Sequence, residues 1–123
     1  MIQGNISSAL EFVELPRFTT IVTALVSDEE YRRFQSELIE EPERGDLIQG
    51  TGGFRKARMP LAGGVKSGGA RVIYLYLPDQ EVIFLATLYK KSKRETLTDD
   101  EKQSLKEAAR RIKAHFKLGW RDL

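Results

Sequence analysis

The chain has 123 residues and a mass of 14.0 kDa, a usual size for one globular domain, so a single domain is expected over residues 1–123. The 41% hydrophobic content and the net charge of +2 exclude an intrinsically disordered chain. The chain has no cysteine and one histidine, which excludes disulfides, thiolate metal sites, cysteine nucleophiles and a histidine cluster for zinc. We expect no metal or cofactor, and we assign the histidine, His115, no catalytic role.

The first residues of the chain lack both a basic region and an apolar region of the kind found in secretory signals. The sequence also contains no run of 18 apolar residues, which a membrane-spanning helix would need. These two observations predict a cytoplasmic protein with no membrane partner.

Charge is unevenly distributed along the chain. Residues 27–46 contain eight acidic and three basic residues, whereas residues 52–94 contain nine basic and two acidic residues. A basic segment of this kind suits a phosphate backbone or an acidic protein partner, and a solvated charged surface is the ordinary alternative. We interpret the glutamates around the end of a predicted helix as a solvated acidic face and not as a metal site: Glu37, Glu40, Glu41 and Glu43.

The N-terminal part predicts one strand followed by two helices. Residues 10–15 alternate apolar and acidic side chains, which predicts a short strand. Residues 17–26 carry apolar side chains at helical spacing, which favours a short helix, with a strand as the alternative because many of them are β-branched. The capping box at residues 27–30 predicts a second helix that begins at Asp28 and ends before Pro42.

The C-terminal part predicts three strands and a long helix. The glycine-rich residues 60–69 predict a mobile hairpin loop. A second capping box at residues 98–101 opens a helix that continues to about Lys117, and residues 119–123 are expected to fray. Apolar patterning predicts the strands at residues 54–59, 70–77 and 81–89, with a bulge or a shifted register in the first of them.

This order of elements predicts an α+β fold in which N-terminal helices and a C-terminal helix pack on a small, mainly antiparallel sheet. We expect the helices to cover one face of the sheet and to leave the other face open. Tyr74 and Tyr76 share one face of a strand, and they either complete the core or line the open surface. Phenylalanines from every element are expected to build a single core: Phe12, Phe34, Phe54, Phe84 and Phe116.

Basic residues are expected to converge on the open face. Lys56 and Arg58 lie on the first strand of the meander. Arg71 begins the second strand and Lys91 follows the third, and antiparallel pairing places the end of one strand beside the start of its neighbour. An RNA phosphodiester is cleaved by its own 2′-hydroxyl when that group is oriented and the developing charge is neutralised. Without a histidine pair, the acid–base role falls to Tyr89 or to a lysine of lowered pKa.

Three ordered blocks of the sequence form a specific combination. They are GDLIQGTGGFRKAR at residues 45–58, GGARVIY at residues 68–74, and LYKK at residues 88–91 followed by Leu97-Thr98 and a helix. These blocks resemble the RelE/HigB toxins of type II toxin–antitoxin modules over residues 18–116. The segment DEEYRRFQ at residues 28–35 and Pro42 are similar to the HigB branch.

The resemblance implies a RelE-like fold and a small mRNA interferase that enters the ribosomal A site, cleaves the message there and is silenced by an antitoxin encoded beside it. The antitoxin is expected to be a helix-turn-helix protein, through which the toxin reaches operator DNA indirectly. The family's motifs place the catalytic residues on Lys56, Arg58, Arg71, Tyr89 and Lys91. Neighbouring bases are expected to bind RNA: Arg55, Lys66, Lys90, Lys93 and Arg94.

RelE itself carries a tyrosine near its C-terminal end, whereas no tyrosine follows Tyr89 here, so Tyr89 or a lysine must take that role. Two other functions stay open at this point. ParE toxins share the fold but inhibit DNA gyrase through protein contacts, and the convergent bases argue against them. A non-enzymatic RNA-binding protein would use the basic face for backbone affinity only, although the chain has no aromatic-rich strand of the RNP type.

Overall fold

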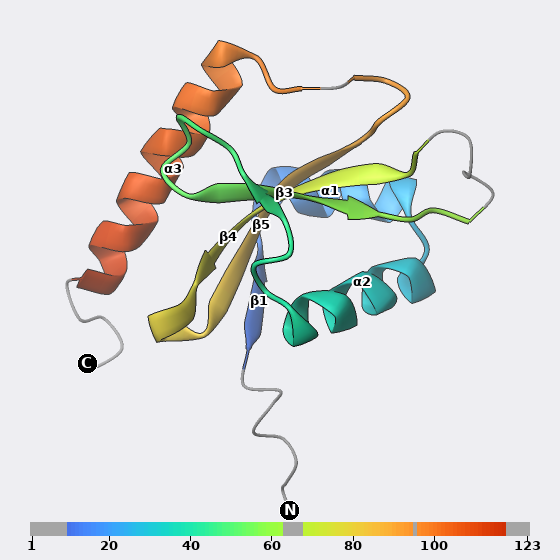
Figure 1. Cartoon of the computed structure of the whole chain (residues 1–123), viewed down its shortest axis with the longest axis horizontal. Helices are drawn as coiled ribbons and strands as arrows, with labels where there is room; N and C mark the ends of the chain where they lie inside the picture. Colours follow the sequence, from blue (N-terminus) through green and yellow to red (C-terminus); the bar gives the residue numbers. More distant parts are fainter. Residues whose placement is uncertain (1–9, 63–67, 95, 118–123) are drawn as a thin grey trace, which may run out of the picture.

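The computed structural model describes residues 10–62, 68–94 and 96–117, which form three α-helices around a five-stranded sheet (Figure 1). Lys66 and the tail at residues 119–123 lie outside the described residues. No described helix is both long and apolar enough to span a bilayer. The elements in chain order are β1 (Glu11–Glu14), α1 (Pro16–Leu25), α2 (Asp28–Glu40), β2 (Asp46–Leu47), β3 (Phe54–Met59), β4 (Ala70–Leu77), the 3-10 turn η3 (Pro78–Gln80), β5 (Val82–Lys90) and α3 (Asp99–Lys117).

The sheet has the strand order β1-β5-β4-β3-β2. The pairs β2–β3, β3–β4 and β4–β5 are antiparallel, and only β1 runs parallel to its neighbour β5, so the predicted mainly antiparallel sheet is confirmed. The two-residue strand β2 was not predicted from the sequence. It forms one edge of the sheet by pairing Asp46 with Lys56 and Leu47 with Arg55.

The helices begin where local chemistry favours them. Ser27 Oγ accepts from the Glu30 amide at 3.1 Å, and the Glu30 carboxylate accepts from the Ser27 amide at 2.8 Å, so the predicted capping box opens α2. Thr98 and Glu101 make the same reciprocal pair at 3.1 and 2.8 Å at the start of α3. The short helix predicted after β1 is also confirmed, with Pro16 in its first turn.

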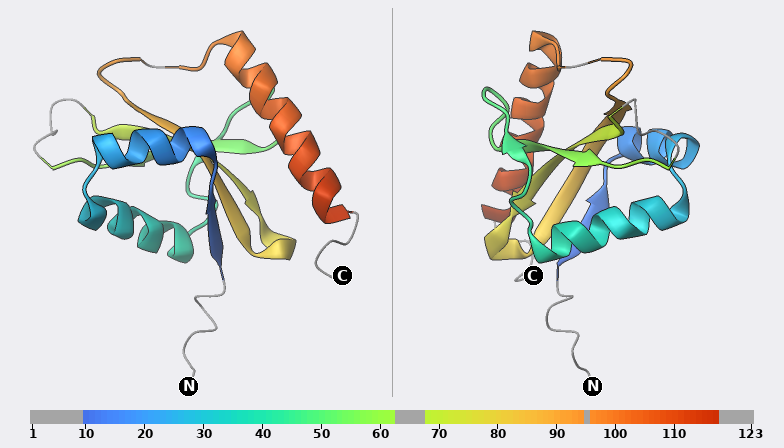
Figure 2. Two further views of the ribbon diagram at one scale, coloured as in Figure 1. Left: turned by 180° about the vertical axis from the view of Figure 1, so that it is seen from behind. Right: turned by 45° about the vertical axis from the view of Figure 1, so that its right-hand side comes forward.

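Helices cover both faces of the sheet, so the expectation of one open face was wrong (Figure 2). Helices α1 and α2 pack on one face against a cluster that includes Val72 and Tyr74 of β4. Helix α3 packs on the opposite face against a second cluster that includes Ile73 and Leu75. Because consecutive β4 side chains are apolar and point to opposite faces, each face needs its own cover. The predicted single core is therefore two clusters, one on each side of the sheet.

Among the described strands the pairing is interrupted once, in β5. Strand β3 pairs without interruption with β4, so the bulge predicted for residues 54–59 was wrong. Between β4 and β5, Tyr74 pairs with Leu85 but Ile73 pairs with Thr87, which leaves Ala86 as an extra residue. An extra residue changes which face the following side chains occupy. The bulge thus places Tyr89 on the face covered by α3.

Tyr74 and Tyr76 complete the core beneath α1 and α2. Tyr74 is 0% exposed, and its hydroxyl donates to the Pro42 carbonyl at 2.7 Å and accepts from the Gly45 amide at 3.0 Å. Burial raises the pKa of the Tyr74 phenol, so this hydroxyl stays protonated near neutral pH. Tyr76 is half-buried and packs against the same cluster. Neither tyrosine therefore belongs to an open surface.

Candidate functional site

Three of the expected site residues form a row across the three central strands. The register pairs Arg58 of β3 with Arg71 of β4, and Arg71 with Tyr89 of β5. Directly opposed residues of antiparallel strands have Cβ atoms about 4.5–5.5 Å apart and point to the same face. The face is the one that carries α3, because Ile73 and Leu75, which alternate with Arg71 along β4, pack beneath that helix. We call Arg58, Arg71 and Tyr89 the cross-strand row.

Two lysines lie beside this row. Lys56 precedes Arg58 by two residues on β3 and shares its face, opposite Ile73. Lys91 directly follows β5, and its amide donates to the Gly69 carbonyl at 3.0 Å. The structure therefore brings all five expected catalytic residues to the same end of the sheet.

The two arginines of the row converge on a single carbonyl oxygen. Arg58 Nε donates to the Gly68 oxygen at 3.1 Å, and Arg71 Nη1 donates to the same oxygen at 2.8 Å. Arg71 Nη1 also lies 3.3 Å from the Ala70 oxygen. This shared acceptor holds two like charges side by side, which would otherwise repel each other. The result is a concentrated positive charge at the surface of the sheet.

The glycine pair before β4 makes this arrangement possible. Gly68 and Gly69 have φ angles of +78° and +74°, a region that favours glycine. A Cβ atom at Gly69 would lie 2.5 Å from the Met59 oxygen, and one at Gly68 would lie 3.1 Å from Lys91 Cδ. The role of Gly68 was not predicted from the sequence. The available signal was the paired glycine immediately before a strand, which marks a turn with positive φ.

Tyr89 is half-buried and packs against the cluster beneath α3. The Arg94 guanidinium lies over its ring, with its central carbon 5.0 Å from the ring centroid. Arg94 also forms a bidentate pair with Glu101, in which Nη1 donates to one carboxylate oxygen at 3.0 Å and Nη2 donates to the other. The bond from Arg94 holds the pKa of Glu101 down at about 2, and the bond to Glu101 raises the pKa of Arg94.

The other residues expected to bind RNA do not all join this site. Arg55 lies on the opposite face and donates to the Glu43 and Gly45 carbonyl oxygens at 3.1 and 2.7 Å. Lys90 pairs with Ala70, whose side chain belongs to the cluster under α1 and α2, so it too lies on the opposite side of the sheet. Lys93 is exposed in the turn after β5.

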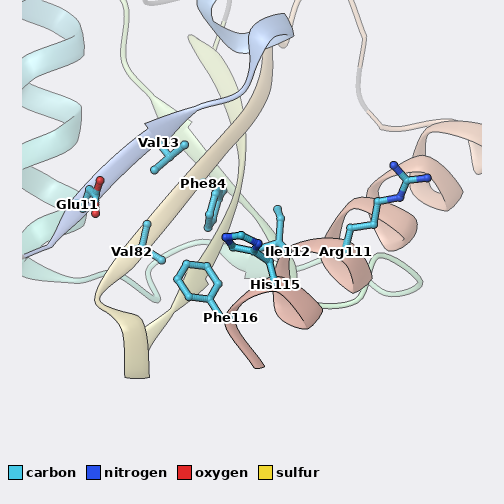
Figure 3. A pocket seen from close by; sticks show the side chains of 8 residues that line it. All are labelled: Glu11, Val13, Val82, Phe84, Arg111, Ile112, His115 and Phe116. Atoms are coloured by element: carbon cyan, nitrogen blue, oxygen red, sulfur yellow. The ribbon is translucent and has the colours of Figure 1, made fainter. Parts of the chain in front are cut away.

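An apolar groove lies on the α3 side of the sheet but away from the row. It has a volume of about 350 Å³ and is lined by β1, the start of β5 and the C-terminal half of α3 (Figure 3). Phe84 in its wall precedes Tyr89 by five residues, which is roughly 15 Å along a strand. His115 lies on the rim of this groove, with its ring edge-on to Phe116. The groove and the cross-strand row are therefore separate features.

The cross-strand row and its lysines offer several donors to one anion. Guanidinium groups bind phosphate oxygens through directed N–H bonds, and lysines add point charges beside them. A tyrosine hydroxyl in the same row offers a group that can donate or accept a proton. Within residues 10–62, 68–94 and 96–117, no group of three or more acidic or histidine side chains is arranged to hold a metal ion.

Comparison with known proteins identifies the family of this chain. Residues 26–119 match the family described as the RelE toxin of the RelE/RelB toxin–antitoxin system. A chain in the crystal structure of the intact E. coli RelBE toxin–antitoxin complex superposes with a TM-score of 0.53 at 20% identity, covering 67% of this chain and 96% of that chain. The isolated E. coli RelE toxin in a P21 crystal form gives 0.52 at 18% identity, covering 81% and 99%. At such identities the structures show a shared fold, and the family match, which spans more than half of the sequence, shows that this chain belongs to the RelE toxin family.

Proposed function

We propose that this RelE-family toxin is a ribosome-dependent endoribonuclease that cleaves mRNA in the ribosomal A site and so stops translation. The observation that carries the proposal is the cross-strand row, in which two arginines and a tyrosine from three strands lie side by side on one face of the sheet, beside Lys56 and Lys91. A toxin that acted only through protein contacts would not need this convergence of phosphate-binding and proton-transferring groups.

In the proposed reaction the 2′-hydroxyl of the message loses its proton and attacks the adjacent phosphorus. The bond to the 5′-oxygen of the next nucleotide breaks, and that oxygen takes up a proton, which leaves a 2′,3′-cyclic phosphate and a 5′-hydroxyl. Arg58 and Arg71 stabilise the charge that develops on the phosphate, and Lys56 and Lys91 bind neighbouring phosphate oxygens. We assign a proton transfer to Tyr89, because this tyrosine lies next to Arg71 in the register.

The proposal includes an antitoxin partner. The E. coli RelBE crystal structure is a toxin–antitoxin complex of a protein with the same fold. By analogy, a cognate helix-turn-helix antitoxin neutralises this toxin in the cytoplasm and links it to operator DNA. The segments at residues 28–35 and Pro42 support placing the chain in the HigB branch of the family.

Primer extension on translated message tests the activity. Purified toxin is added to programmed ribosomes, and we expect new 5′ ends within codons, whereas the same message without ribosomes stays intact. Arg71→Ala serves as the inactive variant and Arg55→Ala, on the opposite face, as its matched control. Intact message together with lost DNA supercoiling would replace the proposal with a ParE-like gyrase inhibitor. Binding to ribosomes without any cleavage would leave an RNA-binding module.

A further inference from the structure

The ring of Tyr89 contacts two parts of the protein. It packs against the apolar cluster beneath α3, and the guanidinium of Arg94 lies over it, 5.0 Å from the ring centroid. Arg94 comes from the segment that connects β5 to α3. A planar guanidinium stacked on an aromatic ring restricts the ring only if the guanidinium is itself fixed.

Arg94 is fixed by every one of its guanidinium nitrogens. Nε and Nη2 donate to the Thr96 carbonyl at 3.3 and 3.0 Å, and Nη1 and Nη2 donate to the two oxygens of Glu101. Two parallel bonds to one carboxylate set the plane of the guanidinium as well as its position.

Glu101 lies in the first turn of α3 and is anchored there by Thr98, which precedes the helix. Its carboxylate accepts from the Thr98 amide at 2.8 Å, and its own amide donates to Thr98 Oγ1 at 3.1 Å. Helix α3 is held on the sheet by Leu105, Ala109 and Ile112. An unbroken series of contacts therefore runs from the packed helix through Glu101 and Arg94 to the tyrosine ring.

We propose that Glu101, acting through Arg94, is a positioning residue that fixes the orientation of the Tyr89 ring in the cross-strand row. The inference rests on the proposed role of Tyr89 in RNA cleavage. It also reassigns Arg94: its charge is paired with a carboxylate and its nitrogens are bonded within the protein, so it orients the tyrosine and does not bind the message. The depressed pKa of Glu101, which Arg94 causes, keeps this carboxylate ionised at neutral pH and the pair intact.

Nuclear magnetic resonance of the free, full-length protein tests the positioning directly. The chain has four tyrosines, and with ¹³C-labelled tyrosine the ring signals of Tyr89 are assigned from a Tyr89→Phe variant. We expect Arg94→Gln and Glu101→Gln to shift the Tyr89 ring signals. The matched control is Glu107→Gln, which breaks glutamate–arginine pairs on the exposed side of the same helix and should leave those signals in place. Unchanged Tyr89 signals in both Arg94→Gln and Glu101→Gln would overturn the inference.

Single-turnover cleavage on programmed ribosomes tests the consequence for the reaction. We expect Arg94→Gln and Glu101→Gln to slow cleavage by about tenfold, and to slow it no further when Tyr89→Phe is already present, because residues that act through one group are not additive. If each substitution instead slows cleavage by the same factor with and without Tyr89→Phe, Arg94 and Glu101 do not act through Tyr89. Arg94→Lys keeps the positive charge but removes the planar guanidinium that bonds both oxygens of Glu101. Slower cleavage by this variant supports the positioning role. Full cleavage activity would indicate instead that Arg94 binds RNA directly.

The two experiments separate this inference from the proposed function. The resonance measurement needs neither ribosomes nor RNA. If the wild-type protein fails to cleave message on ribosomes, the proposed function is wrong, while the Tyr89 signals still decide whether Glu101 and Arg94 position the ring.

Discussion

Each face of the sheet carries a tyrosine and an arginine, but their burial and their hydrogen-bond partners differ between the two faces. On the α1/α2 face, Tyr74 is fully buried and Arg55 donates to the carbonyls of residues 43–45, so both tie the segment after α2 to the sheet. On the α3 face, Tyr89 is half-buried and Arg71 shares the Gly68 carbonyl with a second arginine.

The helices that cover the two faces also differ in charge. Helix α2 carries five acidic and two basic residues, whereas α3 carries four acidic and six basic residues. A polyanion is therefore repelled from the α2 side and attracted to the α3 side. This difference between the two faces shows that residue type alone does not identify an anion-binding site. The polar atoms must also converge on a surface that an anionic ligand can approach.

Exchanging each tyrosine for phenylalanine should separate chemistry from stability. Tyr89→Phe is expected to slow single-turnover cleavage by about 10²–10⁴-fold if its hydroxyl transfers a proton, with little change in melting temperature. Tyr74→Phe should leave the rate of folded protein unchanged and lower stability by about 1–3 kcal/mol, because the Pro42 oxygen and Gly45 amide lose a buried partner. Cleavage rates and denaturant unfolding of both variants check this. A wild-type rate for Tyr89→Phe would leave this ring as a packing residue only.

The arginines offer a second contrast of the same kind. Arg71→Ala should slow cleavage by about 10²–10³-fold, by analogy with the loss of one donor to a developing anion, and should abolish toxicity in cells. Arg55→Ala should lower stability by about 1–3 kcal/mol, since two carbonyls lose a charged donor, and should keep the cleavage rate. Circular dichroism establishes that both variants fold. Equal cleavage rates in the two variants would remove Arg71 from the site.

Substitutions at two glycines, Gly68 and Gly50, distinguish the effect of backbone strain from the effect of disturbing the candidate site. Gly68→Ala and Gly50→Ala both place a side chain at positive φ, +78° and +83°, and each should cost about 1–2 kcal/mol. A Cβ at Gly50 would meet nothing within 4 Å, whereas one at Gly68 would press on Lys91. We therefore expect similar losses of stability by thermal unfolding, and slower cleavage in Gly68→Ala only. Equal cleavage by both variants would show that the position of Lys91 does not matter.

Much of the fold follows from local sequence signals, but which face each strand presents does not. Both capping boxes and the β4–β5 hairpin were predicted, because they depend on residues close together in the chain. The extra residue Ala86 leaves no distinct local mark, yet it decides that Tyr89 lies beside Arg71. The position of α3 was mispredicted although a signal existed: β4 is apolar at consecutive positions, which indicates burial on both faces.

The candidate site, like the fold, was predicted only in part. Family-like motifs selected five residues that the structure brings together, whereas the RNA-binding set mixed residues from both faces. Strand alternation alone separates Arg55 from Lys56, and Lys90 from Tyr89. The bond from Arg94 to Glu101 spans a connection between two elements, and no periodic pattern predicts such a contact.

The two capping-box glutamates give the smallest contrast, in the pH dependence of stability. Glu101 has a folded pKa of about 2, lowered chiefly by its bonds from Arg94 and Thr98, and the pKa of Glu30 is also lowered, chiefly by the Ala62 and Ser27 amides. A depressed carboxyl pKa stabilises the fold above the unfolded value of about 4.5, and that stabilisation is lost as the pH falls toward the folded pKa.

Thermal unfolding between pH 6 and pH 2.5 should therefore show a fall in stability that Glu101→Gln partly removes. Its share should be on the order of 1 kcal/mol or less, since the pair is about one-third exposed and is screened by solvent. Glu30→Gln is the matched variant on the other side of the sheet, and it should remove a part of the fall that Glu101→Gln does not. Because Arg94 loses its carboxylate partner over the same pH range, the Tyr89 ring signals should begin to shift with it in the wild type. A pH profile that neither substitution alters would show that other carboxylates govern acid unfolding.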